Sequence, residues 1–158
     1  MKRLFQSIVA SLLTLSPSAR ASDRRLSPDQ QILLAKAESA VKNYIVNGHE
    51  YPLFAMSLRK DGEVVSTLAS DEFTDKREAF IELLRLLIPL VQTGEITANV
   101  LVTPMDPIPG YEQRPVTFDL EQKGRKRVLV LIPYKKGVSG WEFGAKEYRE
   151  AEPKLFAP

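Results

Sequence analysis

Residues 116–134 read VTFDLEQKGRKRVLVLIPY and indicate two successive β-strands. In the first, three apolar side chains alternate with three polar ones: Val116, Phe118 and Leu120 with Thr117, Asp119 and Glu121. A period of two is expected when one face of a sheet is dry and the other is wet. The second run, residues 128–132, is apolar without alternation. It predicts a strand that is covered on both faces or that lies at a partner interface.

Three more strands are expected before this pair. A hairpin is indicated by two short apolar-leaning segments on either side of Asp61-Gly62, a dipeptide that suits tight turns because it tolerates positive φ. A further apolar segment, residues 96–103, lies between the hairpin and the two strands predicted within residues 116–134. The strands predicted from these patterns cover residues 53–59, 63–69, 96–103, 116–122 and 127–134.

Two main helices are expected among these strands. The first begins after Ser27, which can cap it together with Gln30, and ends before Gly48. The second begins after Asp75 and carries a wide apolar face, so we expect it to be largely buried. Pro89 removes one of its backbone hydrogen bonds, which predicts a kink or an early end there.

The order of the elements is α-β-β-α-β-β-β, with only a short further helix expected at 145–151. This order predicts an α+β fold in which a five-stranded antiparallel sheet packs against two main helices. Over residues 27–150 the order resembles that of roadblock and profilin-like domains. The resemblance implies an interaction or ligand-sensing module, and it assigns no site residues.

The composition is that of one globular domain and excludes several chemistries. Of the 158 residues 44% are apolar and 27% are charged. The chain has no Cys, which removes disulfides, thiolate nucleophiles, zinc-thiolate sites and iron–sulfur clusters, and His49 alone cannot form a two-His metal motif. The glycines miss the spacing of phosphate-binding loops. We therefore expect no metal and no cofactor, and we assign no catalytic residue.

Residues 1–21 have the order of a secretory signal peptide. A basic start precedes an apolar-leaning run at 4–15, and Ala19-Arg20-Ala21 offers small residues for cleavage before Ser22. We accordingly expect residues 22–26 to be a flexible lead-in and 27–158 to be a single domain that is periplasmic or secreted. No segment of the mature chain is expected to span a membrane. The alternatives are an organellar transit peptide and a cytoplasmic protein with a nonfunctional leader.

The formal charge of +2 depends on this leader. Three of the 22 basic residues lie in 1–21, which leaves 19 basic against 20 acidic residues in the rest. One dense basic cluster stands in the turn before residue 128: Lys123, Arg125, Lys126 and Arg127. Such a turn could contact phosphates or anionic headgroups, or could protect a sheet edge and keep it soluble. No aromatic residue interrupts the cluster, so we expect no nucleic acid as partner.

Two segments are candidates for recognition. The first is the Pro-rich loop 104–115, whose stiffness lowers the ordering cost of binding. The second is the aromatic stretch around Trp141. The candidate binding residues in the two segments are Met105, Ile108, Tyr111, Trp141 and Phe143. The alternative for Trp141 and Phe143 is that they seal an end of the core.

Two carboxylates on the alternating strand, Asp119 and Glu121, could in principle serve acid–base chemistry, but solvation of an outer sheet face explains them more simply. The function expected from the sequence is therefore a small, exported, non-enzymatic domain that binds an unknown protein or small ligand. A homodimer formed through the sheet is a further expectation. The alternatives are a small hydrolase whose sequence contains no recognised catalytic motif and a cytosolic roadblock-like dimeric adaptor.

Overall fold

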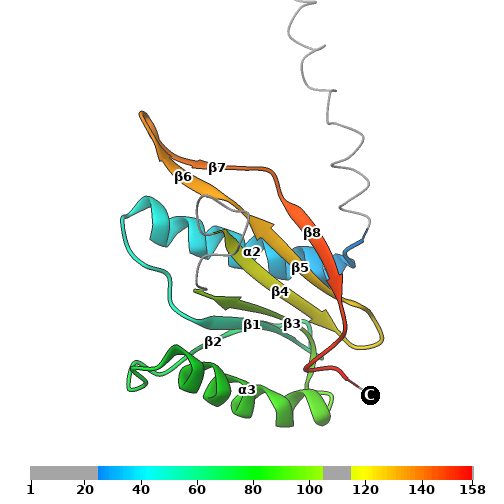
Figure 1. Cartoon of the computed structure of the whole chain (residues 1–158). Coiled ribbons are helices and arrows are strands. Elements are labelled where there is room, and N and C mark those ends of the chain that lie inside the picture. The colour runs from blue at the N-terminus through cyan, green and yellow to red at the C-terminus, as the bar shows by residue number, and fades with distance from the viewer. Residues whose placement is uncertain (1–24, 105–114, 158) are drawn as a thin grey trace, which may run out of the picture.

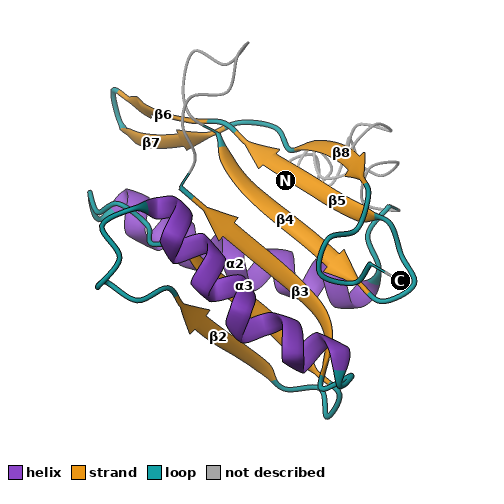
Figure 2. Ribbon diagram, turned by 60° about the horizontal axis from the view of Figure 1, so that its bottom comes forward, coloured by secondary structure: helices purple, strands orange, loops and turns teal. Residues whose placement is uncertain are grey.

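The computed structural model describes residues 25–104 and 115–157. Six strands form one antiparallel sheet in the order β2-β1-β3-β4-β5-β8, and β6 and β7 form a separate hairpin. The two helices lie on opposite faces of the sheet (Figure 1 and Figure 2). The elements are α2 (Pro28–Val46), β1 (Phe54–Arg59), β2 (Val64–Leu68), α3 (Lys76–Gln92), β3 (Ile96–Thr103), β4 (Val116–Gln122), β5 (Arg127–Ile132), β6 (Tyr134–Gly137), β7 (Gly140–Phe143) and β8 (Glu147–Ala151).

The α+β class, the antiparallel sheet and the element order through β5 are confirmed, but the C-terminal end differs from the prediction. The sheet has six strands rather than five, because the short helix expected at 145–151 is the strand β8. Glu, Arg and Ala favour a helix locally. Here the free edge of β5 offers backbone hydrogen bonds, and Tyr148 packs against the core on one face of β8 while its neighbours point to the other.

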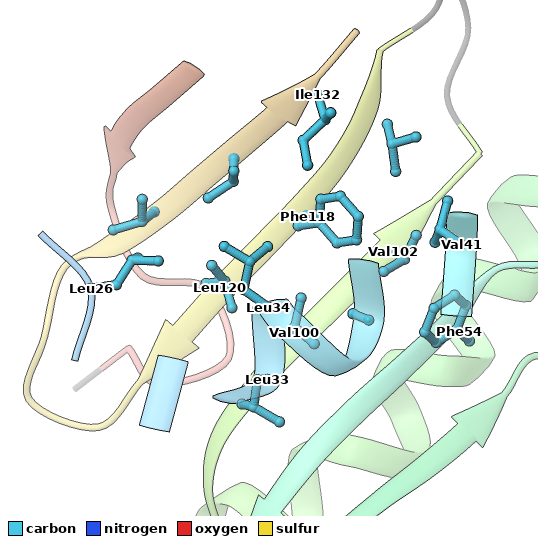
Figure 3. Close-up of a cluster of buried hydrophobic side chains, with 14 of the residues drawn as sticks. Leu26, Leu33, Leu34, Val41, Phe54, Val100, Val102, Phe118, Leu120 and Ile132 are labelled. Carbon is cyan, nitrogen blue, oxygen red and sulfur yellow. The ribbon is translucent and has the colours of Figure 1, made fainter. Parts of the chain in front are cut away.

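The larger core lies between α2 and the first face of the sheet, as the close-up in Figure 3 shows. The helix contributes Leu33, Leu34, Ala37, Val41 and Ile45, and the strands contribute alternate residues from β1, β3, β4 and β5. In β4 these are Val116, Phe118 and Leu120, the apolar half of the alternating pattern. Burial of this set removes a large apolar surface from water, which is the dominant stabilising term in folding.

The start of α2 forms hydrogen bonds within its own first turn and with the sheet. The predicted capping box is present: the Gln30 N–H donates to the Ser27 hydroxyl oxygen, and the Ser27 N–H donates to the Gln30 side chain. The Ser27 hydroxyl also donates to Gln122 at the end of β4, and the Gln122 amide donates to Asp29 over 3.1 Å. These contacts set the angle at which α2 crosses the sheet.

The second face is covered by α3, less completely than predicted. Ala79, Leu83 and Leu87 are buried against β1 and β3, but Ile88 and three other large apolar residues of the helix stay exposed. The helix continues through Pro89 to Gln92, so of the two predicted effects of the proline, a kink or an early end, the early end is wrong. Only one turn follows the proline, and that turn is closed by the backbone N–H of Thr93, which donates to the Pro89 carbonyl. No helix within residues 25–104 or 115–157 has the length and apolar character needed to cross a membrane.

Glu38 joins α2 to the segment between β7 and β8. Its two oxygens lie 2.6 Å from Nζ of Lys42 and 2.7 Å from Nζ of Lys146. Burial raises the pKa of Glu38, but the hydrogen bonds and charges of Lys146 and Lys42 outweigh it, so the pKa lies below its usual range. The carboxylate is therefore stabilised in the folded chain, and this stabilisation is present above the ordinary glutamate pKa and lost as pH falls through the lowered value.

Replacing Glu38 by Gln is expected to lower the free energy of unfolding by about 1 kcal/mol at neutral pH, a modest value because both lysines are more than a third exposed. Urea denaturation of the two proteins at neutral pH and at about pH 3 measures this, and the difference should shrink at the acid end. A difference that stays constant between the two pH values would show that the charge of Glu38 does not cause it.

Candidate functional site

Half of the second sheet face is left open by α3. The helix packs over Ala55 of β1 and Leu101 of β3, and Figure 2 shows β4, β5 and β8 continuing beyond it. The chain after β8 turns back over this face, where Leu155 and Phe156 pack at the edge of the α3 core. A hollow of about 250 Å³ lies between α3, the open strands and this C-terminal tail, residues 152–157.

The walls of this hollow, called here the sheet-face pocket, combine apolar and charged side chains. Phe80 enters from α3, and Lys154 enters from the C-terminal tail. The remaining lining comes from the alternate residues of the strands that point to the second face: Leu101, Thr103, Thr117, Asp119, Arg127, Leu129, Leu131 and Arg149. Leu129 and Leu131 of β5 point to this pocket, whereas the residues between them point to the core under α2. The non-alternating apolar sequence of β5 therefore has apolar side chains on both faces of the sheet.

An ion pair crosses the floor of the pocket. Nε of Arg127 donates to Oδ1 of Asp119 and Nη2 donates to Oδ2, each over 2.7 Å. The side chains are only 12% and 14% exposed. The hydrogen bond to Asp119 raises the pKa of Arg127, against the opposing effect of burial. A bidentate pair of this kind fixes the orientation of the guanidinium plane.

Glu121 holds the C-terminal tail against the same face. Its Oε2 accepts the backbone N–H groups of Lys154, Leu155 and Phe156 over 2.8, 2.9 and 3.3 Å. The side chain is 4% exposed. The prediction that Asp119 and Glu121 are simply solvated on a wet sheet face is therefore wrong, because Arg127 and the tail cover them.

Thr117 places an unsatisfied hydroxyl at the pocket. The residue is 8% exposed, and its Oγ1 has no hydrogen-bond partner within the described part of the chain. A buried hydroxyl without a partner is unfavourable by about 1–3 kcal/mol in protein mutational data. Thr117 lines the pocket, but this oxygen atom is itself buried in the described structure.

Replacing Thr117 by Val exchanges the hydroxyl for a methyl group of similar shape. It is expected to raise the free energy of unfolding by about 1 kcal/mol, because the unpaired group is removed without loss of a hydrogen bond. Urea denaturation measures the change. Thr97→Val on the neighbouring strand is the matched control: it removes a hydroxyl that donates to the Leu58 carbonyl over 3.3 Å, and it should destabilise. A destabilised Thr117→Val variant would mean that the hydroxyl already has a partner.

The sequence candidates Trp141 and Phe143 lie on β7, apart from the sheet-face pocket. Tyr134 of β6 stands 5.8 Å from the Trp141 ring and 6.1 Å from the Phe143 ring between centroids, and Nζ of Lys42 lies 4.9 Å from the Phe143 centroid. Both residues are partly buried against the α2 core. Packing accounts for these contacts, and binding at them stays a prediction. Met105, Ile108 and Tyr111 lie outside the described residues.

The four basic residues of the turn between β4 and β5 differ in their contacts: two form ion pairs and two are exposed at the tip. Arg127 faces the pocket, and Nζ of Lys126 lies 3.0 Å from Glu150 of β8, an exposed pair that raises the pKa of the lysine. Lys123 and Arg125 are exposed at the tip. The turn therefore presents two cations to solvent, and its contact with phosphates or headgroups stays a prediction.

Further hollows lie elsewhere in the described chain, and one of about 410 Å³ has Glu50, Asp71 and Lys76 in its lining. A larger hollow of about 560 Å³ lies between α2 and the β1–β2 edge, but Lys36 is the one charged residue in its lining. His49 is exposed after α2, and Ser139 is at the tip of the β6–β7 hairpin. Within residues 25–104 and 115–157 no three His, Cys, Asp or Glu side chains gather where they could hold a metal ion.

Comparison with known proteins adds no assignment to this geometry. No family model, no curated protein and no solved structure matches the chain. The likeness to roadblock and profilin-like domains therefore rests on the order of elements alone, and it assigns no role to the residues of the pocket.

Proposed function

We propose that this chain is an exported, non-enzymatic binding domain, and that it holds a small ligand or a side chain of a protein partner in the sheet-face pocket. One observation carries the proposal: the open half of the sheet forms a pocket whose walls join apolar residues to oriented charges. Binding sites combine an apolar lining with a few convergent polar groups in this way. The volume lies slightly below that of ordinary drug-sized sites, which suits a small ligand.

The carboxylates near the pocket favour binding over hydrolysis. A general acid or base needs an oxygen that can exchange a proton with the substrate. Both oxygens of Asp119 accept hydrogen bonds from Arg127, and Oε2 of Glu121 accepts three backbone N–H groups. These hydrogen bonds hold both carboxylates in fixed positions, as structural and positioning residues are held.

Nuclear magnetic resonance of the isotope-labelled full chain, titrated with a library of small fragments, tests the binding proposal. Fragments that bind should shift the backbone signals of Thr117, Leu129 and Leu131 together. Shifts confined to Trp141 and Phe143 would move the binding role to β7. Turnover of an ester or peptide substrate that is lost in Asp119→Asn would instead support the hydrolase alternative.

Export is the second part of the proposal, and the leader at residues 1–21 supports it. The test is the intact mass of the protein recovered from separated cell fractions of a Gram-negative expression host. A species that begins at Ser22 in the exported fraction is the expected result. A cytosolic species that still carries residues 4–15 would contradict export and leave a cytoplasmic role.

A further inference from the structure

We propose that the sheet-face pocket selects small organic anions, specifically a carboxylate attached to a short apolar group. The inference rests on the proposed binding function and adds the chemical class of the ligand. It depends on three features of the pocket: its surplus of cationic groups, the apolar part of its lining, and the way in which the tail presents Lys154.

The charges of the lining favour an anion. Three cationic side chains, Arg127, Arg149 and Lys154, share the pocket with a single carboxylate, Asp119. Outside the lining, Glu147 lies 2.7 Å from Nε of Arg149 and Glu121 lies 3.9 Å from Nε of Arg127, so part of the charge of both arginines is balanced. Lys154 has no carboxylate partner among the residues that the structure describes, which leaves an uncompensated positive charge at the wall.

Arg127 also keeps hydrogen-bonding capacity after it has bound Asp119. A guanidinium has five N–H donors. Two of those of Arg127 are engaged by Asp119, through Nε and Nη2. Since the pair locks the guanidinium plane, the remaining donors are held in place before a ligand arrives, and the ordering cost of binding is reduced.

The remainder of the lining suits an apolar group. Phe80, Leu101, Leu129 and Leu131 form the apolar walls of a volume of about 250 Å³. A fully ionic ligand would make no use of these apolar walls, and a purely apolar one would leave the Lys154 charge without a partner. A carboxylate with a short apolar tail satisfies both parts of the lining.

The position of Lys154 depends on the tail. Its own backbone N–H is one of the three groups held by Glu121, so its side chain starts from a fixed point beside the pocket. Removing the ammonium group should therefore weaken anion binding without disturbing the tail, because Glu121 contacts only the backbone.

The experiment titrates the labelled full chain with hexanoate, hexanamide and hexylamine, which differ in charge at one end of the same apolar chain. Hexanoate is expected to shift the signals of Thr117, Leu129 and Leu131 saturably and to bind at least about tenfold more tightly than hexanamide, as loss of a charged hydrogen-bond partner implies. Lys154→Gln should weaken hexanoate about fivefold and leave hexanamide unchanged. The matched control, Lys123→Gln, removes the same charge at the exposed turn tip and should have no effect.

Three results would overturn the inference. Hexanamide or hexylamine binding as tightly as hexanoate would remove the preference for anions and leave the proposed binding function in place. Equal weakening by Lys123→Gln and Lys154→Gln would show a general charge effect in place of local recognition. If none of the three compounds shifts the pocket signals, both the inference and the proposed use of this pocket fail.

Discussion

Replacing Glu121 by Gln is expected to release the C-terminal tail, with a loss of about 2 kcal/mol in the free energy that holds it closed. The three N–H groups of residues 154–156 converge on one carboxylate oxygen. Hydrogen bonds to a charged acceptor are roughly twice as strong as those to a neutral one, and the variant keeps only the neutral oxygen. The new amide N–H₂ would also stand near Nε of Arg127, which is 3.9 Å from Oε1 of Glu121.

Hydrogen exchange of the three tail amides measures this release. Their exchange should become about 30-fold faster, the factor that corresponds to 2 kcal/mol, while amides in the middle of β3 and β4 change less. Glu72→Gln, which neutralises an exposed carboxylate beside α3, is the control and should leave the tail amides unaffected. Unchanged tail exchange in Glu121→Gln would mean that packing of Leu155 and Phe156 alone holds the tail.

The elements that were predicted correctly are those whose signal is local. The capping box of Ser27 and Gln30 and the turn at Asp61-Gly62 depend on residues a few positions apart, and both are present, with Gly62 at a φ of 88°. The apolar alternation of β4 likewise predicted the face that packs on α2. Short-range patterns suffice here because capping, turn geometry and side-chain alternation are determined within one element.

The strand β8 was mistaken for a helix because its environment is nonlocal. Nothing within residues 147–151 shows that the edge of β5 is open and will pair with this segment. Local helix propensity amounts to a few tenths of a kcal/mol per residue, and a row of backbone hydrogen bonds with Tyr148 on the core outweighs it.

Only part of the candidate site could be predicted from the sequence. A hairpin with its turn at 123–126 places Arg127 across from Glu121 and diagonal to Asp119, so the ion pair could have been inferred from the register. The hydrogen bonds between Glu121 and the tail could not be inferred, because they join residues 33 to 35 positions apart through backbone N–H groups. Backbone donors are present in every sequence and leave no side-chain pattern. The pocket exists only once this tail and α3 have both been placed.

Breaking the Asp119–Arg127 pair is expected to be the most destabilising single change near the pocket. Asp119→Asn should lower the free energy of unfolding by about 2–3 kcal/mol, because it leaves the largely buried Arg127 charge with only the more distant Glu121 carboxylate to balance it. The value lies below that of a fully buried pair because both side chains keep some contact with water. The raised pKa of Arg127 keeps this stabilisation fully present below the ordinary arginine pKa, so neutral pH is suitable for the measurement.

A double-mutant cycle of Asp119→Asn and Arg127→Met, followed by urea denaturation, isolates the interaction from the effects of each substitution. We expect a coupling energy of about 2 kcal/mol. The control pair, Lys126 and Glu150, is in the same part of the sheet at 3.0 Å but is 74% and 46% exposed. Its coupling should not exceed about 0.5 kcal/mol. A coupling of about 0.5 kcal/mol or less in both pairs would mean that burial adds nothing to the Asp119–Arg127 bond. A pocket floor held that weakly could not keep the guanidinium donors in place before a ligand binds, and the proposed preorganisation of Arg127 would have to be abandoned.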